Sequence, residues 1–184
     1  MTNYLVRFDV TQVAEATESR LLEDGRFSVM LRAGKWTVEA EGFGSSPVEV
    51  AKHLVLDLLS MGVQVNEALP ELVTMADVAR RAGVSKQAVS NWANRDVNGD
   101  HFPRPWNSTD TTLIWDWNLV NEWLRSRGHN HHEWETLTTY QAGQVNDWLR
   151  AQEMPRRPVD AVLRPVPLRQ VAPHQKQRLH VQPI

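Results

Sequence analysis

The stretch Met75–Asn94, MADVARRAGVSKQAVSNWAN, decides the fold of the central part of the chain. It predicts a helix-turn-helix, in which two short helices cross and the second can enter the DNA major groove. Gly83 falls at the turn, where the backbone needs a positive φ, and Ala79 is small where the helices must touch. Thr74 and Ser85 can cap the two helices with their side-chain oxygens. The apolar residues of the predicted core are Val78, Ala82, Val84, Val89 and Trp92.

Polar side chains line the outer face of the second predicted helix. A helical hairpin that packs only against its own protein leaves such a face unexplained, whereas these groups suit the reading of base edges. We therefore interpret the stretch as a DNA-binding module. The outward residues are Lys86, Gln87, Ser90, Asn91 and Asn94.

The residues that follow predict a wing and a third helix. Two candidate strands, HFPRPWN at His101–Asn107 and TTLIWDW at Thr111–Trp117, flank a short turn. Asp116 can cap a helix over residues 118–127, and Gly128 ends it. Helix, turn, helix, wing and helix together make a winged helix-turn-helix domain.

These motifs resemble those of two known protein families. VSKQAVSNW at Val84–Trp92 resembles the recognition segment of LacI-type repressors, V-S-x-x-T-V-S, with alanine at position 88 in place of the hydroxyl residue. FPRPW at Phe102–Trp106 and LIWDWNLVNEWL at Leu113–Leu124 resemble AlpA-type and excisionase-type members of the MerR superfamily. Together they cover about 55 of the 184 residues. The resemblance implies base reading by Lys86, Gln87 and Asn91 and phosphate contacts by Ser85 and Ser90.

Three arginines are further candidates for phosphate contacts. Arg81 lies near the end of the first helix, where a solvated surface position is the alternative. Arg95 follows the second helix, where a cation also suits a helix C-terminus. Arg104 lies in the wing beside Trp106, which either contacts DNA or packs on the third helix.

Residues 1–68 predict a small α+β domain. SPVE at Ser46–Glu49 begins a helix that runs to about Met61, and residues 14–23 form a short helix or a loop. The resulting order, βαββα(β), suggests a ferredoxin-like or similar sandwich. Nothing here has catalytic spacing, so we expect dimerisation, sensing or contact with a partner protein. The expected strands lie near residues 4–10, 27–31, 36–40 and 63–65.

The domains after residue 70 differ in charge. Residues 71–128, the winged domain, carry seven basic and seven acidic side chains. Residues 129–153 contain a predicted helix, Glu133–Ala151, that we expect to support a dimer. Residues 154–184 hold six of the ten prolines and six basic side chains against one acidic. We expect a disordered arm that tethers DNA or, as the alternative, binds a partner or adds solubility.

Composition narrows the function classes. There is no cysteine, no apolar run of membrane length and no signal-peptide pattern, so we expect a cytoplasmic protein with no membrane contact. No nucleophile–base pair and no glycine-rich phosphate loop appears, so we expect no enzyme, no catalytic residue and no cofactor. His129, His131 and His132 form the one metal-like cluster, but a polar interdomain loop is the preferred interpretation and no metal is expected. Core packing is favoured over a base-stacking platform for Trp115, Trp117 and Trp123.

These observations predict a sequence-specific regulator of transcription, a repressor, that binds double-stranded DNA as a homodimer. Two alternatives stay open. The excisionase-like wing also fits a recombination directionality factor. An antitoxin-like autoregulator, whose residues 1–68 bind a partner protein, is the other.

Overall fold

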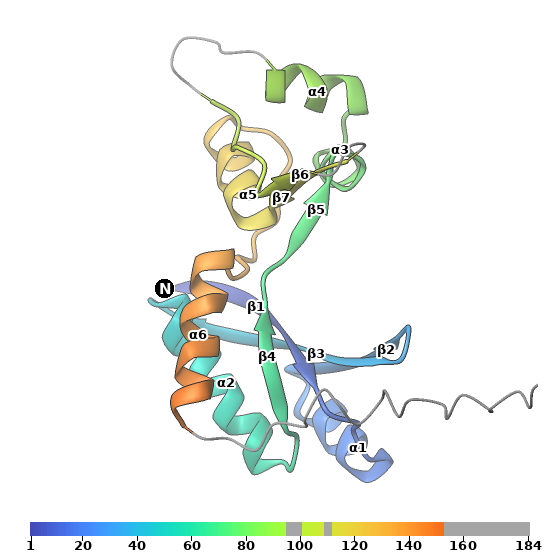
Figure 1. The fold of residues 1–184 in the computed structure, drawn as a ribbon, viewed down its shortest axis with the longest axis vertical. Coiled ribbons are helices and arrows are strands. Elements are labelled where there is room, and N and C mark those ends of the chain that lie inside the picture. The colour runs from blue at the N-terminus through green and yellow to red at the C-terminus, as the bar shows by residue number, and fades with distance from the viewer. Residues whose placement is uncertain (95–100, 109–111, 153–184) are drawn as a thin grey trace, which may run out of the picture.

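The computed structural model describes residues 1–94, 101–108 and 112–152. Arg95, the predicted wing turn in part and the proline-rich segment 154–184 lie outside the described residues. The described chain is α+β, with two antiparallel sheets that belong to two units stacked along the long axis of the molecule (Figure 1). No helix in these ranges has both the length and the apolar character to cross a lipid bilayer.

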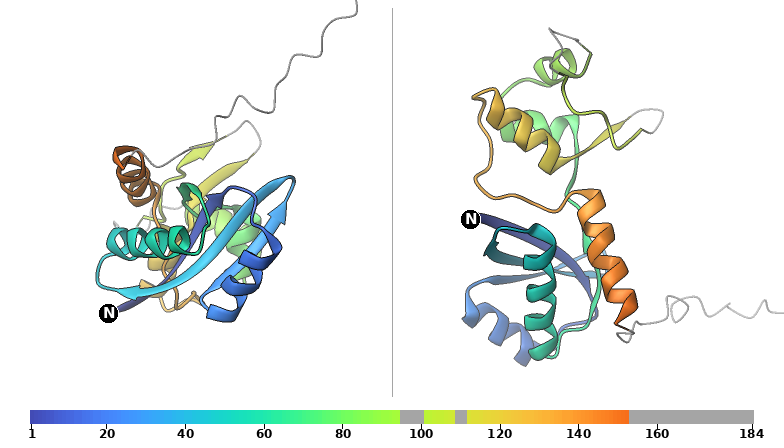
Figure 2. Two further views of the ribbon diagram at one scale, coloured as in Figure 1. Left: turned by 90° about the horizontal axis from the view of Figure 1, so that it is seen from below. Right: turned by 90° about the vertical axis from the view of Figure 1, so that its left-hand side faces the viewer.

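The N-terminal unit is a four-stranded sheet with helices on one face (Figures 1 and 2). Its strands run in the order β2-β3-β1-β4, and each is antiparallel to its neighbours. The element order agrees with the predicted βαββα(β), and residues 14–23 fall mostly in a helix rather than a loop. Its elements are β1 (Thr2–Val10), α1 (Glu15–Asp24), β2 (Phe27–Arg32), β3 (Lys35–Gly44), α2 (Pro47–Ser60) and β4 (Val65–Leu69).

The predicted helix cap and the alternation of buried residues along the strands explain where the elements of this unit begin and which side chains they bury. Ser46 accepts a hydrogen bond from Glu49 N at 3.4 Å and begins α2 as expected. Alternate residues of β1, from Tyr4 to Val10, are buried against the helices. The fourth strand starts at Val65 rather than at residue 63, because Val63 N still donates to Leu58 O in the turn that ends α2.

The last helix belongs to this same unit. α6 spans Thr139–Ala151 and packs on α2 and β4, with its buried side chains in the N-terminal core (Figure 2). The predicted start at residue 133 is wrong, because Glu135 is held in an extended segment that exchanges backbone hydrogen bonds with Asn3 and Leu5 at 3.0 and 2.9 Å. Thr138 then opens the helix with a capping box. The apolar stripe expected to support a dimer is therefore occupied within the chain.

The winged unit follows the N-terminal sheet directly. β4 leads through Pro70 into β5, which pairs with β7 in a three-stranded sheet of order β5-β7-β6 (Figure 1). The helix-turn-helix and the third helix are present where predicted. The elements are β5 (Leu72–Thr74), α3 (Met75–Ala82), α4 (Lys86–Asn94), β6 (Asn107–Ser108), β7 (Leu113–Asp116) and α5 (Trp117–Ser126).

The wing is shorter than predicted. Its first strand covers Asn107–Ser108 and not 101–107, so Ser108 lies in a strand and not in the turn. Pro103 and Pro105 lack the N–H groups that a ladder requires, which explains the irregular backbone before β6. β5 was not predicted at all, since its three residues form a strand only through β7.

Tryptophans fill the core of the winged unit, as the spacing predicted. Trp115 and Trp117 are fully buried, and Trp123 is partly buried against the same cluster. Trp106 is different. It stays 52% exposed, so it does not pack away against α5.

Candidate nucleic-acid interface

The turn between α3 and α4 sets the direction of the second helix. Gly83 has φ +68° and ends α3 in the left-handed region, as predicted. Val84 N donates to Ala79 O at 2.9 Å, and Ser85 Oγ accepts from Ala88 N at 3.2 Å at the start of α4. The buried Val89 then anchors α4 against the core.

The base-reading candidates share the outer surface of α4. Gln87 and Asn91 lie one turn apart and opposite Val89, and Gln87 Nε2 donates to Asn91 Oδ1 at 3.2 Å. Lys86 flanks them on the first turn and is exposed. The structure thus brings the three residues together along α4. The first turn of this helix also carries free backbone N–H groups that favour an anion.

The serine candidates flank this surface. Ser85 is exposed at the helix start, with its oxygen used as the cap. Ser90 accepts from Asn94 Nδ2 through its backbone oxygen at 2.8 Å and its hydroxyl at 3.3 Å. Because both interactions use oxygen as the acceptor, each serine keeps its O–H available as a donor.

Arg104 and Trp106 project from a segment that is fixed on either side. Phe102 is buried, Pro103 O accepts from Trp115 Nε1 at 3.0 Å, and Trp106 N donates to Ile114 O at 2.8 Å. Between these anchors the Arg104 side chain is exposed. A cation and an indole ring are therefore held at the surface beside the wing.

Arg81 is placed elsewhere. Its guanidinium pairs with Glu71 Oε1 at 2.8 Å and lies 4.4 Å from the centre of the Trp117 ring, and its side chain is only 19% exposed. It therefore ties the end of α3 to the link between the units and does not join the surface of α4. Arg95 lies outside the described residues.

The acidic side chains of the described winged unit mostly have structural partners. Asp77 forms a capping box with Thr74, whose hydroxyl and backbone N–H hold the pKa of the carboxyl below its usual range. Asp116 is 4% exposed and accepts from Asn118 N at 3.1 Å and from Thr139 N at 2.6 Å. α4 itself carries no acidic residue. The neutral total charge of this domain thus hides an uneven distribution.

The three histidines have separate surroundings. No group of His, Asp or Glu in the described ranges could hold a metal ion. His129 stacks near Trp92 and Trp123, with ring centres 4.8 and 5.8 Å apart. His132 lies edge-on to Trp117, where burial, then the charge of Arg81, lowers its pKa.

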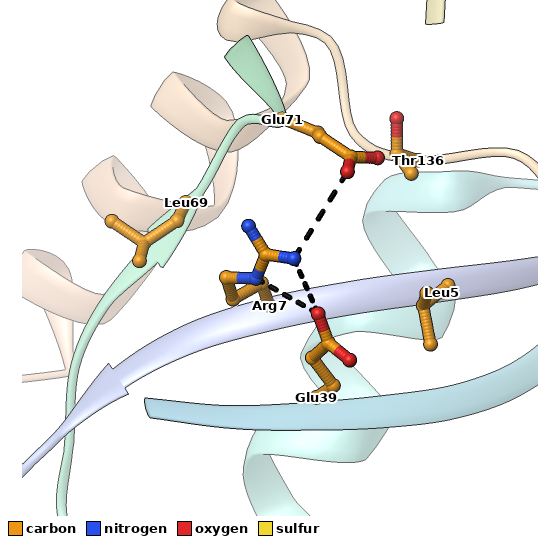
Figure 3. A pocket seen from close by; sticks show the side chains of 6 residues that line it. All are labelled: Leu5, Arg7, Glu39, Leu69, Glu71 and Thr136. Atoms are coloured by element: carbon orange, nitrogen blue, oxygen red, sulfur yellow. Dashed lines mark hydrogen bonds and ion pairs between the residues drawn. The ribbon is translucent and has the colours of Figure 1, made fainter. Parts of the chain in front are cut away.

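A small cavity lies where the two units meet (Figure 3). In it Arg7 Nε donates to Glu39 Oε1 at 3.0 Å, and Arg7 Nη2 lies 4.0 Å from Glu71 Oε1. Glu71 also pairs with Arg81, so four charged groups run from the sheet to α3. With a volume of about 10 Å³ the cavity holds about one water molecule, which excludes it as an effector site. Its lining residues are Leu5, Arg7, Glu39, Leu69, Glu71 and Thr136.

Sequence reasoning missed the residues of this junction. Glu71 and Asp116 each join elements that are far apart in the chain. No local sequence pattern predicts such a role. Asp116 was expected only as a cap for α5, yet it also binds Thr139 at the start of α6.

Searches against protein-family models, curated proteins and solved structures found no match to this chain.

Proposed function

We propose that the protein is a sequence-specific regulator of transcription that binds double-stranded DNA by inserting α4 into the major groove. The observation that carries the proposal is the polar surface of α4, where Lys86 and Gln87 are exposed and the partly buried Asn91 accepts a hydrogen bond from Gln87. Val89 anchors the opposite side of the helix in the core. An α-helix fits the width of the major groove, and these side chains match the polar edges of the bases.

Each α4 residue has a proposed partner. Lys86 recognises guanine O6 and N7, and Gln87 or Asn91 recognises adenine N6 and N7. The hydrogen bond between Gln87 and Asn91 orders both side chains before binding, which reduces the entropy lost on contact. Ser85 and Ser90 donate to phosphates beside them, as the resemblance to LacI-type repressors implies.

The wing supplies a second contact. The exposed Arg104 meets a phosphate, and the exposed ring of Trp106 lies against the backbone or minor groove. One winged unit covers few base pairs, so a homodimer on an inverted repeat completes the site. The excess of basic residues in 155–184 adds affinity without selecting sequence.

Selection of bound sequences from random DNA, followed by titration of single variants, tests the proposal. Gln87→Ala and Asn91→Ala should each weaken binding to the selected site by roughly 1–3 kcal/mol and leave binding to random DNA almost unchanged. Gln144→Ala, the same truncation at an exposed position of α6, is the matched control and should change neither.

The two readouts separate the possible failures. Equal losses on selected and random DNA would show that these side chains do not read bases. If the wild-type chain enriches no sequence and binds random DNA no better than the Arg104→Ala variant, the proposed function is wrong.

A further inference from the structure

The two edges of the N-terminal sheet are treated differently. On β4, Asn146 of α6 accepts from Ala68 N at 2.7 Å and donates to Ala68 O at 3.1 Å, so a side chain covers the edge. β2 is the other edge, and in the described part of the chain no strand lies beyond it. An uncovered edge strand offers its backbone groups to another strand.

The pairing of β2 with β3 shows which backbone groups are free. Glu41 N donates to Arg26 O at 2.8 Å, so the even-numbered residues here exchange hydrogen bonds with β3. In an antiparallel ladder the residues between them direct N–H and C=O to the opposite side. The groups of Phe27, Val29 and Leu31 therefore point outward along the edge.

Apolar side chains are exposed on both faces of β2 and at the end of α1 that precedes it. Leu22 at the end of α1 and Leu31 are each 57% exposed, and Met30 is 40% exposed. Natural edge strands are commonly protected by a charge, a proline or a bulge. β2 has none of these before Arg32, and four of its first five residues, all except Ser28, are apolar.

The charges at the two ends of β2 are opposite. Glu23, Asp24 and Arg26 precede the strand, and Arg26 is paired with Asp24 at 2.7 Å and with Asp57 at 3.0 Å. Arg32 and Lys35 stand at the hairpin tip that follows the strand. A second copy of β2 laid antiparallel brings Glu23 of each copy towards Lys35 of the other. Arg26 then faces Arg32 of the second copy, but its charge is already neutralised by Asp24 and Asp57 within its own chain. Opposite charges placed across strands in this way are favourable.

We propose that β2 is a dimerisation edge, at which two copies of the chain pair their β2 strands antiparallel about a two-fold axis at Val29. Val29 then faces its own counterpart, and Phe27 faces Leu31 of the second copy, so every outward backbone group of the strand is paired. The two four-stranded sheets become one continuous sheet. β2 and α4 lie in different units (Figure 1), so the pairing leaves α4 uncovered. The inference rests on the proposed function only for its purpose, which is to supply the two-fold dimer.

Single cysteines test the register, because the chain has no cysteine of its own. Val29→Cys in the full chain should form a covalent dimer on mild oxidation, since directly opposed Cα atoms lie about 5.5 Å apart and a disulfide spans that distance. Met30→Cys, its neighbour, faces Ser28 of the second copy and should stay monomeric on a denaturing gel. Combining Ser28→Cys with Met30→Cys should restore the covalent dimer. Crosslinking of Met30→Cys as complete as that of Val29→Cys would overturn the register.

Light scattering tests whether the β2 edge forms a dimer in solution. The wild-type chain should show twice its mass of 21.1 kDa, and Leu31→Lys should raise the dissociation constant of the dimer about tenfold. Glu23→Lys and Lys35→Glu should each favour the monomer, and the double variant should recover the dimer. A wild-type monomer, or no recovery in the double variant, would overturn the proposal. Both assays omit DNA, so a dimer that binds no DNA counts against the proposed function alone.

Discussion

The N-terminal unit and the winged unit build their cores from different side chains. Among the residues that the structure describes, twenty-one buried residues, mostly valine, leucine and alanine, form the first core, whereas ten form the second. The smaller core relies on large rings: Trp115 and Trp117 are fully buried, and Phe102 packs edge-on to Trp115 at 5.9 Å. Aromatic side chains bury much area per residue, which is how a small domain compensates for its unfavourable surface-to-volume ratio. Each large residue of the winged unit should therefore carry a larger share of its stability.

The largest expected effect tests that difference directly. Trp115→Ala and Phe8→Ala should each cost roughly 3–5 kcal/mol of unfolding free energy, because both side chains are fully buried. For the winged unit this approaches the whole stability of a small domain. Hydrogen exchange should show Trp115→Ala exposing α3 and α4 while β1 and β3 stay protected. Loss of protection in both units together would mean that they unfold as one, and the comparison would fail.

The junction gives the next largest effect. Asp116 satisfies backbone N–H groups at the start of α5 and of α6, one helix in each unit. Asp116→Ala leaves these partly buried donors without a partner and should cost about 2–3 kcal/mol, measured by urea unfolding. Asp147→Ala, an exposed carboxylate paired with Arg150, is the control and should stay within about 0.5 kcal/mol. Equal small effects would show that the two units are not coupled through this carboxylate.

Gly83 gives a smaller and graded effect. A Cβ atom added there meets nothing within 4 Å, so the cost comes from φ +68° and not from crowding. Gly83→Val should destabilise the winged unit by roughly 1–2 kcal/mol, and Gly83→Asn should cost less, because asparagine tolerates the left-handed region. Thermal melts of the two variants check this order. An asparagine variant as damaged as the valine variant would contradict the backbone explanation.

The sequence predicted the helix-turn-helix well because its signals are local. Gly83, the cap at Thr74 and the spacing of apolar residues act within a few residues of where they stand. β5 and the late start of α6 depend instead on distant partners, namely β7 and the backbone of Asn3 and Leu5. No local pattern carries that information.

The same distinction applies to the candidate interface. Lys86 and Gln87 are exposed on α4 as expected, because helical spacing fixes their direction, whereas Asn91 is partly buried. The position of Arg81 could not be predicted from its own segment, because its guanidinium pairs with Glu71 and lies over the ring of Trp117. One of these partners precedes the helix-turn-helix in the sequence and the other follows it. Tertiary partners decide the position of a long flexible side chain more than the local sequence does.

The smallest expected effect is a difference between the helix caps of the two units: the stability that the α3 cap contributes should depend on pH, and that of the α2 cap should not. In the winged unit Asp77 reciprocates the cap of Thr74, and its pKa is lowered mainly by the Thr74 hydroxyl and then by the Thr74 backbone N–H. Because the folded pKa lies below the unfolded value near 3.8, the stabilisation is complete above that pH and is lost as the pH falls through the folded pKa. Asp77→Asn should therefore cost about 0.5–1 kcal/mol at neutral pH and progressively less in acid. α2 of the N-terminal unit is capped by the hydroxyl of Ser46, which does not titrate, so Ser46→Ala should cost a similar amount across the same range. Urea midpoints of both variants and the wild type between pH 7 and pH 3 measure the two trends, and a pH-independent cost for Asp77→Asn would contradict the role of its charge in the cap.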